Sequence, residues 1–406
     1  MSSLASSPAQ AEHPSAAITP TFVREFAFLV ACCAVERTRA SAANFQTLVE
    51  NDFDWPRLFR LAEHHGVTPL IYQALQNCTL PAPPAMLDEL RNRYERNTRK
   101  NLQFTAELFR ILDCLDKNSI PTIPMKGPVL AETVYRDLAL RDFSDLDVLV
   151  RRKDVLKAKA ALGVLGYAAN TQLSEAEERA YLATGYEYTF DGPAGRNLLE
   201  IQWDILPRFY AVDFDCDAFF ERSQTVTLCG RAVRSLSVED LLLTLCVHAA
   251  KHAWVRLHWL RDIAGALESH PHPIDWADFQ RRARELGISR MVGVSLMLAH
   301  RLLDANVPES VKTAWNADLE IKGVVDEILR GLPMAEEYNA ESLRYFRLMM
   351  RLRERRSDRL RLLYRLALTP GPGEWAVVRL PKPLFPLYHV IRMFRLGARA
   401  LRQNRD

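Results

Sequence analysis

The sequence predicts an α+β protein in which a small sheet core lies between two helical regions. Apolar residues recur at helical spacing before residue 119 and again after residue 237. Between these positions, short alternating segments separated by Gly, Asp and Pro predict strands and hairpins. This pattern divides the chain into five parts. They are a disordered tail at 1–20, a helical region at 21–118, the α+β core at 119–237, a helical domain at 238–340 and a basic helical extension at 341–406.

The N-terminal part is expected to be helical after a tail that is rich in Ser, Ala and Pro. A first helix is predicted at 21–38. Asp54-Trp55-Pro56 predicts the start of another, because Pro suits the first helical turn. A long helix is predicted from Pro84 to Asp116, where apolar residues form one stripe. The stripe consists of Leu87, Leu90, Tyr94, Leu102, Leu108, Leu112 and Leu115.

The core is predicted to contain strands at 120–125 and 145–150, a helix at 153–165 begun near Asp154, and two hairpins. The first hairpin pairs 186–190 with 198–205, and the second pairs 225–228 with 232–236. Helices are then expected at 238–252, 255–268, 275–286 and 289–304.

The charge of the chain is unevenly distributed. Residues 341–406 contain fifteen Arg and one Lys against five acidic residues, a net +11, so residues 1–340 carry −8 and the whole chain +3. A basic block of this kind favours an anionic partner such as a nucleotide, a nucleic acid or a membrane surface. The seven Cys are scattered without a Cys-x-x-Cys pair, which is typical of reduced thiols. No apolar run reaches eighteen residues, and we expect a cytoplasmic protein without a transmembrane segment.

Two carboxylates at alternate positions of one strand form the strongest chemical signal. In the segment 144–150, Asp145 and Asp147 point to the same face of the predicted strand, because strand side chains alternate. Asp is disfavoured inside strands, which weakens the alternative of a simple solvent-facing strand end. Paired carboxylates repel each other unless a cation lies between them, and Mg²⁺ prefers such oxygen ligands. In the later strand, Glu200 lies on one face with Gln202 and Asp204, and it would complete a site of three carboxylates.

A Lys-Gly pair precedes these carboxylates. Gly127 would let a ligand approach the backbone, and Pro128 fits the first turn of the helix that follows. Lys126 would add positive charge for a triphosphate. Arg141 would either contact phosphate or solvate a loop, and the sequence favours neither. Together these residues indicate metal-dependent chemistry on a nucleoside triphosphate (NTP).

These motifs resemble the uncharacterised nucleotidyltransferase family of the polymerase-β-like superfamily. The likeness rests on Lys126-Gly127, Tyr135, Leu140-Arg141 and the segment 144–150. It is extended by His65-Gly66-Val67-Thr68-Pro69-Leu70, by 199–203, and by the segments 248–252 and 259–264. The Gly-Ser of the broader superfamily is absent here, and Gln202 stands where the family commonly has His.

The resemblance implies a small mixed-sheet nucleotidyltransferase core with helical regions on either side. It implies that Asp145, Asp147 and Glu200 are the metal ligands and catalytic residues, with Glu200 as general base or ligand. Mg²⁺ would be the cofactor and an NTP the substrate. It also implies nucleotide contacts from Lys126, Gly127, Arg141 and Ser144. The acceptor hydroxyl would belong to a small molecule, a sugar, a protein or RNA.

One face of the helix at 238–252 carries His248, Lys251 and His252, which share that face by their spacing. One interpretation is a pair of half-buried histidines that pack on Trp259. The other, favoured slightly by the resemblance, is a polar face that contacts the nucleotide or the acceptor. A zinc site is disfavoured, because the Glu of a His-Glu-x-x-His motif is missing.

The basic C-terminus is predicted to form one amphipathic helix through 348–366 and a last helix at 388–402. A solvated helix face is one explanation, and contact with a membrane surface is the main functional alternative. For the whole chain, a Mg²⁺-dependent nucleotidyltransferase is the leading hypothesis. The first alternative is a catalytically degenerate module that binds a nucleotide or a partner in a biosynthetic assembly. The other is a transferase of the toxin–antitoxin type.

Overall fold

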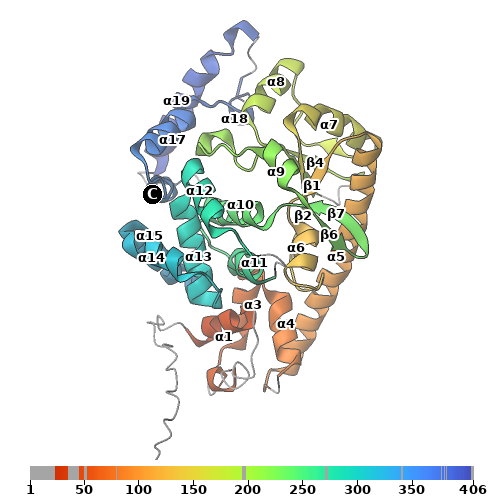
Figure 1. Cartoon of the computed structure of the whole chain (residues 1–406), viewed down its shortest axis with the longest axis vertical. Coiled ribbons are helices and arrows are strands. Elements are labelled where there is room, and N and C mark those ends of the chain that lie inside the picture. Colours follow the sequence, from red (N-terminus) through yellow and green to blue (C-terminus); the bar gives the residue numbers. More distant parts are fainter. Residues whose placement is uncertain are drawn as a thin grey trace, which may run out of the picture.

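The computed structural model describes residues 23–34, 45–49, 53–78, 80–193, 198–269, 273–339, 342–375, 377–378, 380 and 382–403. The tail predicted at 1–20 lies outside these residues. The described chain combines helices with a five-stranded sheet and a separate two-stranded hairpin, as Figure 1 shows. The predicted α+β fold is therefore confirmed.

The sheet is mixed, and its strands run in the order β1-β2-β5-β4-β3. The strands are β1 (Thr122–Pro124), β2 (Asp145–Val150), β3 (Ala168–Ala169), β4 (Glu187–Asp191) and β5 (Leu198–Gln202). Strand β2 pairs antiparallel with β1 and parallel with β5, whereas β4 pairs antiparallel with both β5 and β3. Strands β6 (Gln224–Leu228) and β7 (Arg231–Ser235) form the second predicted hairpin. Strand β5 ends before the predicted residue 205, because Asp204 turns away to accept hydrogen bonds from Arg152 and from the backbone of Ile205.

The two faces of the sheet have different environments. Leu146, Val148, Leu199 and Ile201 belong to one apolar cluster, together with residues of the helices α5 (Pro84–Lys117) and α7 (Val155–Val164). The opposite face carries Asp145 and the other polar residues of β2 and β5, because strand side chains alternate. Helix α6 (Gly127–Thr133) lies between β1 and β2 in the sequence. The apolar face therefore stabilises the sheet by packing on helices, and the polar face is the one on which a ligand would bind.

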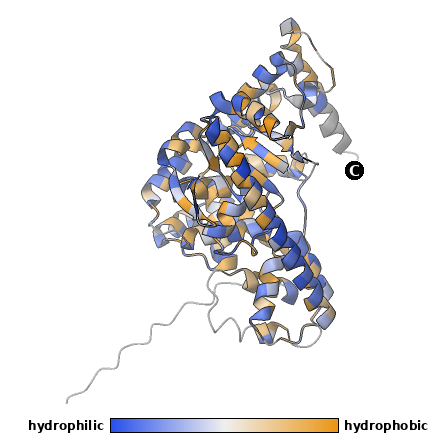
Figure 2. Cartoon of the chain, turned by 90° about the vertical axis from the view of Figure 1, so that its right-hand side faces the viewer, coloured by the Kyte–Doolittle hydropathy of each residue, from blue (hydrophilic) through white to orange (hydrophobic). Residues whose placement is uncertain are grey.

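The N-terminal helices are α1 (Arg24–Cys33), α3 (Trp55–His65), α4 (Thr68–Gln76) and the long α5. Helix α3 begins as predicted, since the Asp54 side chain accepts a hydrogen bond from the Arg57 backbone at 2.8 Å. Helix α1 ends earlier than residue 38, because Ala34 already has extended backbone angles. Helix α5 agrees with its prediction to within a residue. Its outward side is largely hydrophilic in Figure 2.

A second helical group follows the core. Two other helices, α8 (Glu175–Thr184) and α9 (Cys216–Arg222), lie between strands of the core segment and are not part of this group. The group itself consists of α10 (Val238–Lys251), α11 (Leu257–Glu268), α12 (Trp276–Leu286), α13 (Ser289–Leu303), α14 (Glu309–Ala317) and α15 (Leu319–Gly331). Helix α13 packs against α10, α11 and α15. The four helices predicted between 238 and 304 are thus confirmed.

The C-terminus differs from its prediction. Helix α16 (Leu343–Arg351) ends inside the predicted basic helix, and α17 (Arg356–Leu368) starts only after a break. The break contains Arg353, whose buried guanidinium donates to the carbonyl oxygen of Tyr210. The single-helix prediction is therefore wrong, because a buried arginine interrupts it. Helices α18 (Pro372–Trp375) and α19 (Leu387–Gln403) complete the chain.

Among the described residues, no helix combines the length and apolar character needed to cross a bilayer. No disulfide links the seven cysteines, all of which lie within the described part.

A buried histidine joins three distant segments. Nδ1 of His65 accepts a hydrogen bond from the Leu257 backbone at 3.3 Å, and Nε2 lies 3.1 Å from the carbonyl oxygen of Leu332. Because Nδ1 is an acceptor, the ring proton is on Nε2 and donates to Leu332. The His65 side chain is fully buried, and this burial lowers its pKa to about 3. His65 therefore stays neutral in the folded protein.

This neutrality predicts acid-sensitive stability. Between the unfolded pKa of 6.5 and the folded value of about 3, the unfolded chain binds a proton that the native state cannot. Stability should consequently fall as the pH drops below 6.5. His65→Gln should reduce the pH dependence of the unfolding free energy by up to about 1.4 kcal/mol per pH unit. Denaturant unfolding of both proteins between neutral and mildly acidic pH measures this, and identical slopes would contradict it.

Candidate active site

The strand register brings the two predicted acidic motifs together. In the parallel pair β2–β5, Asp147 lies directly opposite Glu200. Asp145 stands two residues before Asp147 and therefore points to the same face. Asp147 is only 5% exposed, whereas Asp145 and Glu200 are half-buried. The structure thus places all three predicted carboxylates on one face of two neighbouring strands.

The carboxylates are close enough to disturb one another. Burial, and then the charge of Asp147, raises the pKa of Glu200 to about 9. The same two causes raise the pKa of Asp145, while Lys126 and Arg141 oppose the increase. Crowded carboxylates of this kind resist full ionisation unless positive charge is nearby. The face consequently favours a cation.

Two side chains already contact Asp147. Nζ of Lys126 lies 3.5 Å from Oδ2 of Asp147. The side-chain amide of Gln202 donates to Oδ1 of Asp147 at 2.9 Å and to Oε2 of Glu200 at 3.2 Å. Gln202 therefore spans the two carboxylates and fixes their spacing, which is a role that its amide NH₂ can fill with two donors.

Helix α10 supplies the opposite wall of the site. Nδ1 of His248 lies 3.3 Å from Nζ of Lys126, and Nζ of Lys251 donates to the Tyr186 hydroxyl at 3.3 Å. Burial and the nearby Lys126 hold the pKa of His248 well below its ordinary value. Burial also lowers the pKa of Lys251, although Glu187 and Glu200 oppose this. His248 is therefore neutral, and two lysines provide the positive charge around the carboxylates.

His252 faces a different neighbour. Its ring stacks on Trp259 with centroids 4.9 Å apart and planes at 29°, while His248 meets Trp259 edge-on at 5.7 Å. Burial and the charge of Lys251 lower the pKa of His252 to about 3. Packing on Trp259 was one of the two interpretations of this helix face. The structure shows that packing for both histidines, and it also brings His248 and Lys251 toward the sheet.

Arg141 is a buried anchor of the site. Its Nε and Nη2 donate to the two carboxylate oxygens of Asp262 on α11 at 3.0 and 2.9 Å, and Tyr135 donates to the same carboxylate at 2.8 Å. Arg141 is 5% exposed, which rules out the interpretation that it solvates a loop. Burial alone would lower the pKa of Arg141, but Asp262 raises it. The charge of Arg141 also opposes the increase in the pKa of Asp145. A contact between Arg141 and a substrate phosphate stays a prediction.

The remaining predicted residues lie at the start of α6 and of β2. Gly127 has a φ of +53°, a left-handed conformation that glycine adopts readily. A Cβ at Gly127 would lie 3.6 Å from the carbonyl oxygen of Asp145, so the two segments approach closely. Ser144 is exposed in the loop before β2. Lys126, Gly127 and Ser144 are thus brought to the same end of the sheet as Asp145.

The donors present suit magnesium, although the described residues contain no ready-made group of three metal-binding side chains. Asp145, Asp147 and Glu200 offer carboxylate oxygens, which Mg²⁺ prefers. Burial, and then the charge of Asp147, raises the pKa of Asp145 and of Glu200, and a bound divalent cation would offset both effects. Gln202 and Lys126 use only part of the acceptor capacity of Asp147, since a carboxylate has about four lone-pair sites.

Sequence reasoning missed two residues of this face. Glu187 on β4 is the register partner of Gln202 and so shares the polar face. Tyr186 precedes it, and its ring lies 5.0 Å from Nζ of Lys251. Burial and Glu187 raise the pKa of Tyr186, which keeps its hydroxyl protonated. The alternation of the predicted strand at 186–190 places Glu187 on a polar face of that strand. Only the pairing with β5 shows that this face is the one that carries Gln202 and Glu200.

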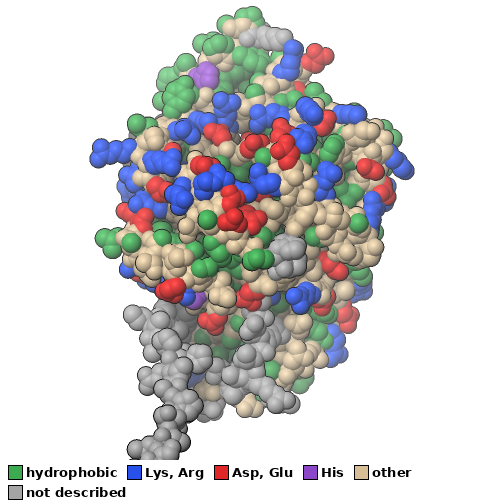
Figure 3. Space-filling view, in the orientation of Figure 1, with side chains coloured by type: hydrophobic (Ala, Val, Ile, Leu, Met, Phe, Trp, Pro, Cys, Tyr) green, Lys and Arg blue, Asp and Glu red, His purple; other side chains and the backbone are tan. Residues whose placement is uncertain are grey.

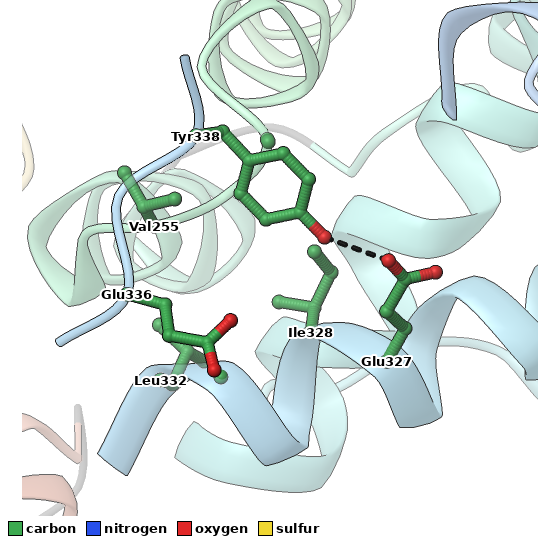
Figure 4. A pocket seen from close by; sticks show the side chains of 8 residues that line it. Val255, Glu327, Ile328, Leu332, Glu336 and Tyr338 are labelled. Carbon is green, nitrogen blue, oxygen red and sulfur yellow. Dashed lines mark hydrogen bonds between the residues drawn. The ribbon is translucent and has the colours of Figure 1, made fainter. Parts of the chain in front are cut away.

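A small hollow in the helical region is separate from this site. Figure 4 shows Tyr338, Glu327 and Glu336 around it, with Ile328 and Leu332 at its apolar side. The Tyr338 hydroxyl donates to Glu327 at 2.8 Å. No predicted site residue lines this hollow, so the carboxylate face of the sheet remains the candidate site.

Comparison with known proteins identifies the family of the chain. A family model described as "Uncharacterised nucleotidyltransferase" matches residues 51–304. No curated protein matches significantly. A crystal structure of ANT(2″)-Ia in complex with adenylyl-2″-tobramycin is 14% identical with a TM-score of 0.32, covering 45% of this chain and 97% of that chain. A solution structure of the antibiotic-resistance factor ANT(2″)-Ia is 15% identical with a TM-score of 0.28, covering 48% and 90%.

The Arg141–Asp262 pair should be essential for stability. Asp262→Asn leaves the buried guanidinium without its counter-charge, which should cost about 3–5 kcal/mol of unfolding free energy. Lys100→Gln removes one partner of the exposed Lys100–Asp142 pair and should cost less than about 1 kcal/mol. Denaturant unfolding of both variants tests the difference. Equal, small losses would show that Arg141 does not depend on Asp262.

Proposed function

The chain belongs to the uncharacterised nucleotidyltransferase family, and we propose that it transfers a nucleoside monophosphate from an NTP to a hydroxyl acceptor with the help of Mg²⁺. The observation that carries this proposal is the register pairing of Asp147 with Glu200, with Asp145 on the same face. A binding module has no need for three adjacent carboxylates, two of which, Asp145 and Glu200, have pKa values raised by burial and by the charge of Asp147.

The metal ligands would be Asp145, Asp147 and Glu200. Bound Mg²⁺ would supply charge stabilisation for the attacking and leaving oxygens of an in-line displacement. The carboxylates are held in place by the chain itself. Gln202 bridges Asp147 and Glu200, and the Met125 backbone donates to the carbonyl oxygen of Asp147 at 2.9 Å. This support fixes the strands before any ligand arrives.

The other residues would bind the substrates and move the proton. Lys126 and Lys251 lie beside the carboxylates and would attract the triphosphate through their charge. Glu200 would accept the proton of the attacking hydroxyl, because a carboxylate with a raised pKa is a stronger base once ionised. The neutral His248 would orient groups by hydrogen bonding rather than by charge.

Titration calorimetry with ATP, CTP, GTP and UTP, each with and without Mg²⁺, tests the nucleotide site. The wild-type chain should bind at least one NTP in a Mg²⁺-dependent manner. Asp145→Asn and Asp147→Asn should weaken that binding at least tenfold, roughly the 1.4 kcal/mol lost with one charge-assisted contact. Asp145→Asn should leave the thermal unfolding midpoint at or above the wild-type value, because burial and the charge of Asp147 raise the pKa of Asp145.

Asp142→Asn is the matched control, since Asp142 is exposed and lies only three residues before Asp145. It should bind NTP as the wild type does. Mg²⁺-dependent binding that survives in the double variant Asp145→Asn/Asp147→Asn would disprove the assignment of the site. Pyrophosphate release in the presence of candidate acceptors then identifies the hydroxyl.

One observation favours the second candidate, a module that binds nucleotide without catalysis. Lys126 and Gln202 already compensate Asp147, so part of the charge that a metal would neutralise is balanced within the chain. A protein with this function would bind NTP equally well with and without Mg²⁺.

Lys126→Met distinguishes the two candidates. If Lys126 binds the triphosphate of a catalytic complex, the variant should lose NTP affinity about tenfold while its affinity for Mg²⁺ alone stays equal or rises, because a competing cation is removed. Parallel titrations with Mg²⁺ and with Mg²⁺-NTP measure both affinities. A loss of Mg²⁺ affinity in this variant would contradict the proposed role of Lys126.

A further inference from the structure

The C-terminal helices expose most of the large apolar side chains that are accessible in the described part of the chain. Phe394 is 75% exposed, Tyr364 67% and Leu360 66%. Others in the same region are Leu363, Leu368, Val377, Val378, Leu384, Leu387, Val390 and Met393. They belong to α17, to α19 and to the segment between these helices, which we call the C-terminal face. An apolar patch of this kind on one part of a molecule marks an interaction surface.

The inward side of the same helices is polar and aromatic. Glu374 is 4% exposed and accepts hydrogen bonds from Arg392 at 3.2 Å and Arg395 at 2.6 Å. Trp375 and Tyr388 are also buried, and the Tyr388 hydroxyl donates to the Val378 carbonyl at 3.0 Å. A helix facing water normally buries its apolar side. Leu362 of α17 is buried. Glu374 and its two arginines also lie inside, whereas Leu360, Leu363 and Phe394 are exposed, so the orientation suits an apolar neighbour.

These helices are also fixed to the rest of the molecule. Arg365 on α17 donates to both carboxylate oxygens of Asp213, at 2.6 and 2.8 Å. Trp375 meets Tyr181 on α8 edge-on at 6.1 Å. The exposed apolar residues are therefore held outward by ordered contacts on their other side. Figure 2 shows the α17–α19 part projecting from the body with hydrophobic segments along it.

The charges around the C-terminal face are positive. Arg355, Arg356 and Arg361 are exposed on or beside α17, and Arg361 also lies 4.0 Å from the Asp213 carboxylate. The sequence from 341 to 406 has a net charge of +11. In Figure 3, hydrophobic side chains gather at the end of the molecule formed by these helices, with Lys and Arg side chains adjacent to them. Leucine and phenylalanine flanked by arginine match the two layers of a lipid surface, acyl chains and anionic headgroups.

We propose that the C-terminal face docks on an anionic phospholipid surface. Leu360, Tyr364 and Phe394 enter the boundary between headgroups and acyl chains, and Arg356 and Arg361 contact the lipid phosphates. Charge complementarity selects this partner, since a zwitterionic lipid surface has no net negative charge to attract the arginines and a nucleic acid offers no apolar layer for the leucines. The inference is independent of the nucleotide site.

Sedimentation of the full chain with lipid vesicles tests the proposal. Vesicles of phosphatidylcholine are compared with vesicles of phosphatidylcholine and phosphatidylglycerol. The wild type should bind the anionic vesicles and bind the neutral ones much less. Leu360→Gln/Phe394→Gln should weaken binding at least about tenfold through lost apolar burial. Arg356→Gln/Arg361→Gln should weaken it by about fivefold for each arginine.

Val164→Gln/Leu319→Gln is the matched control, because these residues are 88% and 80% exposed but lie outside the C-terminal face. It should bind vesicles as the wild type does. Circular dichroism checks that each variant is folded, which is the expected result because the replaced side chains are exposed. The proposal is overturned if the wild type fails to bind anionic vesicles, or if the control loses binding equally. It is also overturned if Leu360→Gln/Phe394→Gln abolishes a dimer seen by sedimentation velocity while vesicle binding is unchanged, because the face would then be a contact between copies.

Discussion

The site depends on how the loop that leads into β2 is held. Arg141 in this loop forms a buried ion pair with Asp262 of α11, and Tyr135 donates to the same carboxylate. From the other side, Asn97 and Asn101 of α5 donate to loop carbonyls, including that of Arg141 at 3.2 and 2.8 Å. The loop therefore connects the N-terminal helices, the sheet and the second helical group. Because Asp145 follows Arg141 by four residues, these contacts also fix where the first carboxylate lies.

The polar face of the sheet carries several carboxylates close together, and in the described part of the chain only a few cationic side chains lie near them. Lys126 and Lys251 approach from α6 and α10, and the neutral histidines add no charge. The opposite face of the same strands is entirely apolar and packs on α5 and α7. One strand thus carries out two tasks, since Leu146 and Val148 stabilise the sheet while Asp145 and Asp147 are kept for ligands. This division follows directly from the two-residue period of a strand.

Much of this arrangement could be predicted from the sequence, because it depends on local spacing. The alternation of Asp145 and Asp147, the long α5 and the hairpins are all encoded within short segments. Long-range pairing was less accessible. The parallel register of Asp147 with Glu200 and the partnership of Arg141 with Asp262 join residues far apart in sequence, so no local pattern reveals them. The break before α17 was missed for the same reason, since the arginine that causes it is bound by Tyr210.

Helix α5 has a mechanical consequence. Its 34 residues span about 50 Å at 1.5 Å per residue, and it contacts α4 near one end and α7 near the other. A continuous helix of this length is stiff along its axis, so it links the N-terminal helices to the sheet as one unit. The Arg141–Asp262 pair and the hydrogen bond from Leu257 to His65 attach α11 to the same unit. Because α11 packs on α10, the distance between the carboxylates and the wall that α10 forms is fixed by contacts made far from the site.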